Sequence, residues 1–215
     1  MTTFPDLLTA RLRRDPSSPF VTFYDDATGE RTELSVVTYA NWISKTANLI
    51  TDELMLDPGD RLRIDLPPHW LGAVFAGATS ACGVLLDRDA DTVVVGPDGL
   101  GTTGRTVMAT ALHPFATRFT TPLPPGVLDH GTLWPGQSDV FSPVAPDELG
   151  SPAPDDRRVL TDLDPLSGSG RALLVGLLAG SGSLVLVAHA EEARWPAHSQ
   201  SERATAVLRA DQPIS

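Results

Sequence analysis

The prolines of this chain restrict its fold most, because nine of the 19 fall between Pro114 and Pro154. A proline inside a helix removes a backbone hydrogen bond and clashes with the preceding turn, so no long helix can form at this density. We therefore predict a Pro-rich irregular connection over residues 98–156, between regular parts at 1–97 and 157–215. Short strands fit this connection at two places, residues 107–112 and 141–144. With 215 residues in all, we expect the three zones to form a single α/β domain.

The first part, residues 1–97, alternates helical and strand patterns. Residues 20–24 and 31–36 are β-prone runs on either side of a turn-forming stretch, which predicts a hairpin. Thr38 is a good N-cap for a helix to about Met55, because apolar residues follow it at three-to-four spacing. The other elements predicted here are a helix capped by Asp6, a strand, a helix and a strand, at residues 6–14, 61–66, 69–84 and 91–96.

The last part contains a strand pattern at residues 158–161, an apolar helix at 171–179 and a strongly apolar strand at 183–189. Two strands joined through a helix form a βαβ unit, whose strands are parallel and whose connection is right-handed. A final helix, broken near Pro196, is predicted over residues 191–209. Because helices and strands alternate at both ends, the chain is predicted to have an α/β layered fold, a largely parallel sheet flanked by helices.

The composition excludes several classes of function. The chain has 16 basic and 27 acidic residues, and its net charge of −11 argues against a nucleic-acid or anionic-membrane partner. Apolar residues make up 41% and charged residues 20%, as in soluble globular proteins. The single cysteine, Cys82, excludes a disulfide framework and a cysteine-based zinc site. No apolar run reaches the roughly 18 residues of a membrane helix and no signal segment opens the chain, so a cytoplasmic protein is expected.

Lysine is almost absent from the chain. Of the 16 basic residues, 15 are arginine and only Lys45 is a lysine. Such a preference for arginine over lysine is typical of a biased nucleotide composition of the genome. It also limits the chemistry, because any mechanism that requires a lysine of this chain must use Lys45.

Five segments follow one another in an informative order. They are Val37–Asn41 (VTYAN), Asp57–Ile64 (DPGDRLRI), Pro67–Ala78 (PPHWLGAVFAGA), Asp164–Gly170 (DPLSGSG) and Leu177–Val187 (LLAGSGSLVLV). This order resembles the N-terminal part of the adenylate-forming superfamily, the acyl-CoA synthetases and related AMP-binding enzymes. The resemblance covers about Phe4 to Val95 and resumes in the last two segments. It implies the scaffold of the large domain of those enzymes.

The catalytic apparatus of that family is not matched. Its Ser/Thr/Gly-rich phosphate loop ends in Pro-Lys-Gly, whereas the nearest match, Gly101–Arg105, lacks this ending and the Thr-Ser that precedes the loop. Family members usually carry a His after a Pro-Leu pair, and Gly168 stands near that place. Lys45 lies on an early helix and cannot replace either family lysine. The chain also ends before the adenine-binding motifs and the small C-terminal domain with its catalytic lysine.

The resemblance therefore implies a truncated, catalytically degenerate relative, a binding or regulatory module without adenylation activity of its own. One alternative is a split enzyme that binds ATP or an acyl group and is completed by a partner chain. Another is a protein-interaction module, with the Pro-rich zone around Trp134 and Phe141 as its contact surface. Self-association of the chain stays open beside a separate protein partner.

The first candidate nucleotide-binding stretch is glycine-rich, and ATP or AMP would be its ligand. It consists of Gly101, Thr102, Thr103, Gly104 and Arg105. With Gly99 it satisfies G-x-G-x-x-G after a predicted strand, a pattern that can hold a pyrophosphate at a helix N-terminus. The competing interpretation is a glycine-rich surface turn.

The second candidate stretch opens a helix after a strand. It consists of Ser167, Gly168, Ser169 and Gly170, and Arg171 would add positive charge. Backbone amides and the helix dipole favour an anion at such a place, although an ordinary βα turn has the same sequence. A ligand would lie outside the carboxyl ends of the parallel strands, the usual crevice in such sheets.

The remaining reactive side chains form no recognised motif, so no catalytic or metal-binding residue is assigned. The histidines show no metal-ligand spacing; they are His69, His113, His130, His189 and His198. No G-x-S-x-G nucleophile pattern occurs. The acidic pairs Asp25–Asp26, Asp155–Asp156 and Glu191–Glu192 are predicted to be solvated turns or helix starts. Cys82 lies in a helix of small residues and is predicted to be buried and inert.

Overall fold

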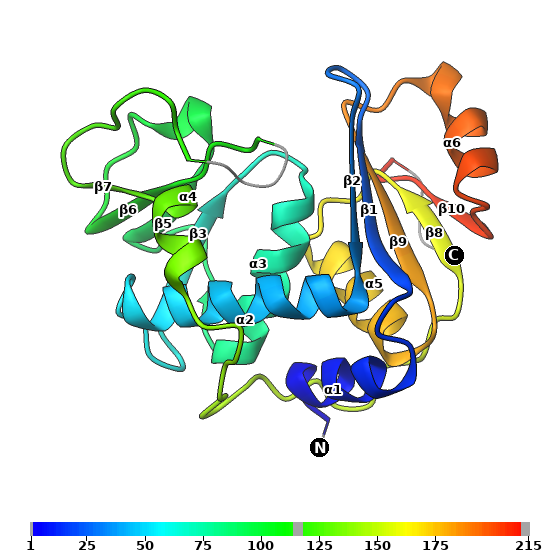
Figure 1. Ribbon diagram of the computed structural model, residues 1–215, viewed down its shortest axis with the longest axis horizontal. Helices are drawn as coiled ribbons and strands as arrows, with labels where there is room; N and C mark the ends of the chain where they lie inside the picture. The colour runs from blue at the N-terminus through cyan, green and yellow to red at the C-terminus, as the bar shows by residue number, and fades with distance from the viewer. Residues whose placement is uncertain (1, 114–117, 212–215) are drawn as a thin grey trace. The chain divides into compact units, whose positions relative to one another are not determined.

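The computed structural model describes residues 2–113 and 118–211 (Figure 1). These residues form two compact units, each with its own sheet. Unit 1 comprises Met1–Ala40, Pro68–Ala76 and Glu148–Ser215, and unit 2 comprises Asn41–Pro67 and Gly77–Asp147. That residues 1–215 act as a single domain stays a prediction.

Unit 1 is built on a sheet with the strand order β10-β8-β9-β1-β2. Its strands are β1 (Pro19–Asp25), β2 (Glu30–Ser35), β8 (Arg158–Thr161), β9 (Ser183–Ala188) and β10 (Ala206–Leu208). β1 and β2 form the predicted hairpin and are antiparallel. β1 with β9, β9 with β8, and β8 with β10 pair in parallel. The predicted α/β class and the predicted parallel βαβ unit are confirmed.

Helices cover both faces of this sheet (Figure 1). α5 (Gly168–Ala179) joins β8 to β9, and α6 (Trp195–Ser201) leads from β9 back past β8 to β10. Right-handed connections that run in opposite directions along a sheet place their helices on opposite faces. All residues of β9 are accordingly buried, and Trp195 of α6 packs with Val185 and Val187.

The first helix, α1 (Phe4–Arg14), confirms the predicted helix but not its predicted cap. The Thr3 hydroxyl accepts a hydrogen bond from the Asp6 amide at 3.3 Å, and the Asp6 carboxylate accepts one from the Thr3 amide at 3.0 Å. This reciprocal pair is a capping box, in which Thr3 is the N-cap. Asp6 is the third helical residue, a position where an acidic residue is easily mistaken for the cap.

The long helix α2 (Val36–Asp52) also begins before its predicted N-cap. The Ser35 hydroxyl accepts a hydrogen bond from the Thr38 amide at 3.2 Å, so Ser35 caps the helix. The helix is confirmed with its start moved toward β2, because the strand runs directly into it. The next helix, α3 (Trp70–Cys82), confirms the helix predicted over residues 69–84.

Unit 2 is built on a second sheet, with the order β4-β3-β5-β6-β7 and parallel pairing throughout. Its strands are β3 (Arg61–Asp65), β4 (Leu85–Leu86), β5 (Thr92–Val95), β6 (Thr106–Ala109) and β7 (Val127–Asp129). Apolar side chains of β5 and β6 form its core, including Val93, Val95 and Val107. The strands predicted within residues 1–97 therefore belong to two different sheets. The alternation of helices and strands along the sequence does not reveal this division.

The Pro-rich zone carries more regular structure than predicted. β6 lies where a short strand fits the sequence, and β7 with the one-turn helix α4 (His130–Leu133) lies farther along. Both β7 and α4 fall between Pro125 and Pro135, where no proline interrupts the chain. The other strand, expected at residues 141–144, does not form.

The helix predicted over residues 191–209 is wrong in its second half. A 3-10 turn, η4 (Glu192–Arg194), leads into α6, and β10 follows. Pro196 occupies the first turn of α6, where proline is tolerated, so it begins the helix instead of breaking it. Arg203 then takes a left-handed conformation (φ 52°) and ends the helical run.

Candidate functional site

The second candidate stretch, Ser167–Gly170, forms the amino-terminal end of α5 at the carboxyl end of β8. The Ser167 hydroxyl accepts a hydrogen bond from the Gly170 amide at 3.0 Å and donates one to the Asp164 carbonyl at 2.7 Å. Ser167 is therefore the N-cap of this helix. The predicted strand–turn–helix order is confirmed, in the kind of place where open parallel sheets bind ligands.

Two glycines of this turn have different surroundings. A Cβ atom at Gly170 would lie 2.0 Å from the Asp164 carbonyl oxygen, so only glycine lets the helix approach the loop. A Cβ atom at Gly168 would meet nothing within 4 Å. Gly168 and Ser169 line a pocket of about 360 Å³. The other lining residues are mainly apolar and come from α5, β10 and the flanks of β8: Arg157, Leu163, Ala172, Leu173 and Leu208.

The first candidate stretch, Gly101–Arg105, belongs to unit 2. β5 and the turn η1 (Pro97–Gly99) precede it, but β6 follows it in place of a helix. The interpretation of G-x-G-x-x-G as a phosphate loop at a helix N-terminus is therefore wrong, because no helix supplies aligned amides there. Nucleotide contact through Gly101–Arg105 in another form stays a prediction.

Packing accounts for part of this glycine-rich loop. A Cβ atom at Gly104 would lie 2.4 Å from the Asp91 carbonyl oxygen, and the Arg105 amide donates to the same oxygen at 2.8 Å. The loop is thus folded back on the residue that precedes β5. Gly101 has open space around it, and the side chains of Thr103 and Arg105 are exposed. These features fit a tight surface turn.

A larger groove, of about 620 Å³, lies beside β7 in unit 2. Its described lining residues come from β7, α4 and the segment before β7: Arg118, Phe119, Thr120, Thr121, Pro122, Leu123, Val127, Asp129 and Thr132. The Asp129 carboxylate already accepts hydrogen bonds from the amides of Phe119 and Gly131 and the hydroxyl of Thr132, at 3.3, 2.9 and 3.1 Å. No predicted nucleotide-binding residue is among these lining residues.

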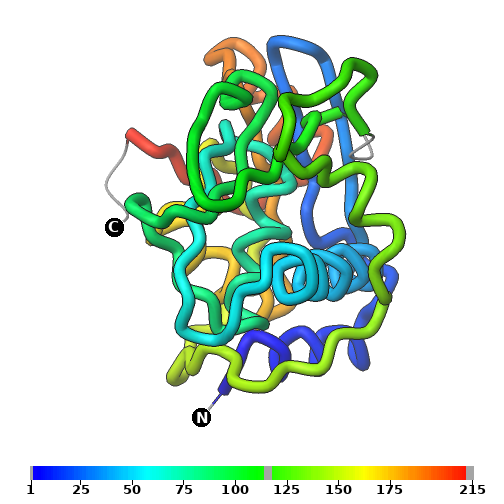
Figure 2. Tube along the Cα trace, turned by 90° about the vertical axis from the view of Figure 1, so that its left-hand side faces the viewer, coloured from blue at the N-terminus to red at the C-terminus, as the bar shows by residue number. Residues whose placement is uncertain are grey.

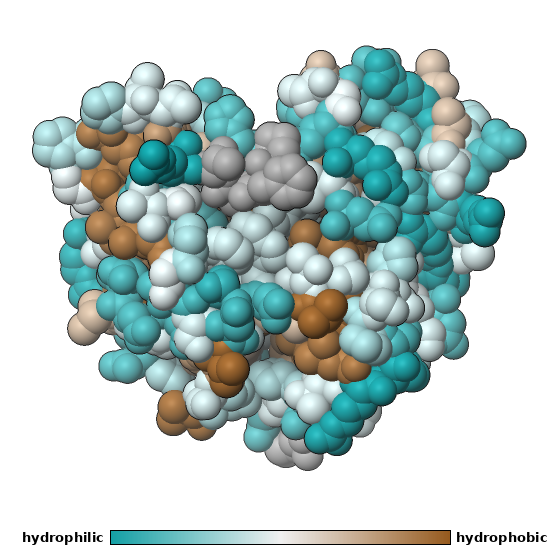
Figure 3. Space-filling view, in the orientation of Figure 1, coloured by the Kyte–Doolittle hydropathy of each residue, from teal (hydrophilic) through white to brown (hydrophobic). Residues whose placement is uncertain are grey.

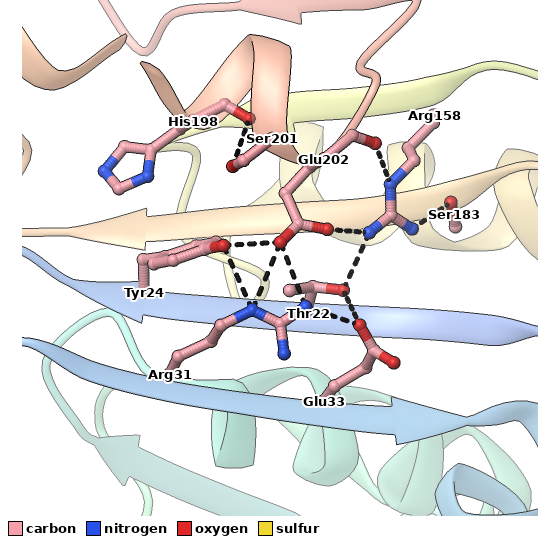
Figure 4. Close-up of polar contacts among 9 residues, drawn as sticks. All are labelled: Thr22, Tyr24, Arg31, Glu33, Arg158, Ser183, His198, Ser201 and Glu202. Atoms are coloured by element: carbon pink, nitrogen blue, oxygen red, sulfur yellow. Dashed lines mark hydrogen bonds and ion pairs between the residues drawn. The ribbon is translucent and has the colours of Figure 1, made fainter.

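A polar cluster that the sequence analysis missed lies on one face of the unit 1 sheet (Figure 4). Glu202, just after α6, is buried and accepts hydrogen bonds from the Tyr24 hydroxyl and the guanidinium groups of Arg31 and Arg158. Burial alone would raise the pKa of Glu202, but these hydrogen bonds outweigh it and hold the pKa below its ordinary value. The partners come from β1, β2 and β8, so no spacing in the sequence signals the cluster.

Two consecutive carboxylates at the end of β1 pair with histidines. His189 Nδ1 lies 2.9 Å from Asp25 Oδ1, and His198 Nε2 lies 2.8 Å from Asp26 Oδ1. Asp26 is buried, and its other oxygen accepts the Glu191 amide at 2.9 Å. The interpretation of Asp25–Asp26 as a solvated turn is therefore wrong for Asp26, whose partners follow it by 165 and 172 positions.

Three further features of the described part of the chain bear on a metal site, a reactive thiol and a membrane helix. Residues 2–113 and 118–211 contain no group of three or more His, Cys, Asp or Glu side chains that could hold a metal ion. Cys82 is buried as predicted, and burial raises the pKa of its thiol to about 12, which keeps it protonated. Within the same residues, every helix is too short or too polar to cross a membrane.

Comparison with known proteins identifies the family of the chain. No protein-family model matches it. A TIGR03089 family protein of Mycobacterium tuberculosis (strain ATCC 25618 / H37Rv) is 34% identical over 237 residues, covering 94% of this chain and 96% of that protein. The chain belongs to the TIGR03089 family.

Solved structures show the fold of this TIGR03089 family member. A Brucella canis acyl-CoA synthetase matches with a TM-score of 0.75 and 14% identity, over 97% of this chain and 47% of its own. Acetoacetyl-CoA synthetase from Streptomyces lividans gives 0.69 and 18%, over 96% and 42%. The inhibitor-bound N-terminal domain of FACL13 from Mycobacterium tuberculosis gives 0.71 and 10%, over 96% and 62%. The predicted fold is confirmed, and the chain spans about half the length of these proteins.

Proposed function

We propose that this protein is a ligand-binding module on the acyl-CoA synthetase fold, without adenylation activity of its own. The pocket at the start of α5 carries the proposal, because Gly168 and Ser169 line it together with Leu163, Leu173 and Leu208. The leucines offer apolar surface, and the helix N-terminus favours a negative charge. A compact acyl chain that ends in a carboxylate, or that is joined to a phosphate as in an acyl-adenylate, fits this chemistry.

The position of Lys45 supports the absence of adenylation activity. Its Nζ atom donates hydrogen bonds to the carbonyls of Pro135, at 3.2 Å, and Gln137, and lies 3.4 Å from Asp139 Oδ1. The only lysine of the chain is therefore engaged with one surface segment. While it is held in this way, the ammonium is not available to neutralise a phosphate.

Calorimetric titration of the purified chain tests the proposal. AMP, ATP with Mg²⁺, and a non-hydrolysable acyl-adenylate analogue serve as ligands. We expect the analogue to bind with a Kd below about 100 μM, roughly 5.5 kcal/mol, and ATP with a carboxylic acid to release no pyrophosphate. Ala172→Trp fills the pocket from α5 and should weaken binding at least about tenfold, whereas Ala172→Ser should not. If the Ala172→Trp protein binds the analogue as tightly as the unsubstituted protein does, the pocket is not the binding site. If ATP with a carboxylic acid releases pyrophosphate, the protein has adenylation activity and the proposed function is wrong.

A split enzyme is the second candidate, because the chain spans about half the length of the solved synthetases it matches. A second polypeptide would then supply the missing lysine and adenine contacts. Binding of ATP with Mg²⁺ by the chain alone, tighter than about 100 μM, would favour this candidate. Pyrophosphate release that appears only when a co-purified partner is added would support it further.

Protein interaction is the third candidate, through the Pro-rich zone around Trp134 and Phe141 or through self-association. Trp134 is half-buried against the protein's own surface, so a partner would have to compete for it. A lack of heat with every ligand at about millimolar concentration would favour this candidate. We also propose a cytoplasmic location for the protein, independent of these three candidates, and cell fractionation with an antibody to the chain would test it.

A further inference from the structure

The segment Trp134–Val140, called the strap, lies beside α2 within unit 2 (Figure 2). It follows α4 and begins with the 3-10 turn η3 (Trp134–Gly136). All of residues 131–150 are described, and none of them is buried. A segment without buried side chains is held by its surface contacts, and such segments are the first to detach in local opening.

The polar contacts of the strap with α2 use mainly its backbone. Four strap carbonyls accept hydrogen bonds from the side chains of Lys45 and Asn48: those of Pro135, Gln137, Ser138 and Val140. The two Asn48 contacts are 3.0 Å long. Because every residue has a backbone carbonyl, these contacts specify the path of the strap backbone, a 3-10 turn followed by bends, and leave most of the sequence free.

Two strap side chains contact α2 itself, and a third, Gln137, donates from Nε2 to Glu53 Oε1 just after that helix, at 3.3 Å. The ring of Trp134 stacks on that of Trp42, with centroids 3.6 Å apart and planes inclined by 18°. Lys45 Nζ lies 5.3 Å from the Trp134 ring centroid and 3.4 Å from Asp139 Oδ1. This face of α2 therefore recognises an aromatic ring and, five residues later, a carboxylate.

We propose that Trp42, Lys45 and Asn48 form a recognition groove for a segment of a partner protein that follows the same backbone path, and that the strap is its internal occupant. The partner segment carries an aromatic residue and a single carboxylate, five residues apart, and is otherwise uncharged. A more acidic partner is disfavoured, because the chain itself has a net charge of −11. This groove belongs to unit 2 and does not depend on the pocket at α5 in unit 1.

The two ends of the strap differ in how firmly they are held. At the amino-terminal end, His130 of α4 is completely buried four residues before Trp134. At the other end, Val140 is 72% exposed and Val144 is 89% exposed. Figure 3 shows apolar atoms at the surface where Figure 1 draws this part of the chain. A partner would therefore displace the strap from Val140 toward Trp134.

A peptide of residues 134–140, with blocked ends and an attached fluorophore, is the probe for the groove, and anisotropy with the full chain is the measurement. In the protein, Asp139→Asn weakens the strap and leaves the groove intact, so we expect it to tighten peptide binding about two- to fivefold. Lys45→Met breaks the same ion pair but removes the groove, so we expect binding to weaken at least about tenfold. These opposite effects separate a groove from a purely structural strap.

Three results would overturn the proposal. The first is equal peptide binding by the Asp139→Asn and Lys45→Met proteins, and the second is no binding to Asp139→Asn at about 1 mM peptide. The third comes from hydrogen exchange, where we expect the strap amides to exchange faster than those of β5 and faster still in Asp139→Asn. If the strap amides exchange as slowly as those of β5, the strap is a permanent part of the fold and does not detach. Thermal melts of both variants verify that they are folded, with Lys45→Gln as a milder second groove variant.

Discussion

Arg11 of α1 donates a hydrogen bond from Nη1 to the backbone carbonyl of Gly180, which lies at the end of α5, at 3.0 Å. The same side chain is 1% exposed, and it also donates to the carbonyls of Leu177 and Ser181, at 3.0 and 3.2 Å, and to Asp15 at 2.7 Å. The last carbonyls of a helix lack partners within it and carry partial negative charge. An arginine of one helix therefore caps the carboxyl end of another.

Replacing this arginine should destabilise unit 1. We expect Arg11→Met to lower the free energy of unfolding by about 3 kcal/mol, because it leaves the Leu177 and Ser181 carbonyls without this donor. Arg14 still donates to the Gly180 carbonyl and lies 3.7 Å from Asp15 Oδ1. The loss of about 3 kcal/mol corresponds to a fall in melting temperature of roughly 6–12 °C for a chain of this size. Arg13→Met, at an exposed position of the same helix, should change stability by less than about 0.5 kcal/mol. Equal effects of the two substitutions in thermal melts would contradict the capping role.

The two glycines at the start of α5 should respond differently to alanine. Gly170→Ala forces a Cβ atom to within 2.0 Å of the Asp164 carbonyl oxygen, so the loop must move, and we expect a loss of about 2 kcal/mol or more. Gly168→Ala adds a methyl group in open space and should be neutral or slightly stabilising. Urea unfolding of the pair measures the difference. If Gly170→Ala does not lower the free energy of unfolding, the helix and the loop are packed less closely than the 2.0 Å distance indicates.

Two buried histidines should make the fold sensitive to acid. Burial lowers the pKa of His69 and of His130 to about 4, against about 6.5 in an unfolded chain. The unfolded state therefore binds these protons first as the pH falls. Stability that is fully present above about pH 6.5 is lost toward pH 4, by at most roughly 3 kcal/mol for each histidine.

Urea unfolding across this pH window provides the measurement. His69→Asn cannot titrate there and should flatten the dependence of stability on pH relative to the unsubstituted protein. The same slope in both proteins would argue that His69 is protonated without cost in the fold.

Glu202 should contribute more to the free energy of unfolding than Glu33, the more exposed carboxylate of the same cluster. Glu202→Gln leaves the guanidinium of Arg158, which is 19% exposed, without its carboxylate, and we expect a loss of about 2–3 kcal/mol. Glu33→Gln, at the more exposed end of the cluster, should cost less than about 1 kcal/mol. In a double-mutant cycle, Glu202→Gln with Arg158→Met should cost clearly less than the sum of the single changes. Additive losses would show that the two side chains act independently.

Sequence patterns predicted the local part of the second candidate site. Ser167 stands before an apolar helix and after a strand, and the structure shows it as the N-cap. They could not predict that Leu208, from a strand where a helix was expected, would complete the pocket wall. For the first candidate site the glycine pattern indicated a helix start, but the backbone enters β6, because Gly104 is packed on the Asp91 carbonyl.

The sequence by itself determined where most helices and strands form and that their βαβ order makes a parallel sheet, because periodicity and handedness are local properties of the chain. Only the tertiary structure decided which strands share a sheet and which distant side chains meet. The contact of Asp26 with His198 and the gathering of Tyr24, Arg31 and Arg158 around Glu202 are examples. A charged or polar residue contributes equally to the pattern of polar and apolar residues along the sequence whether its side chain faces water or a buried partner. Its partner becomes known only when the path of the whole chain is known.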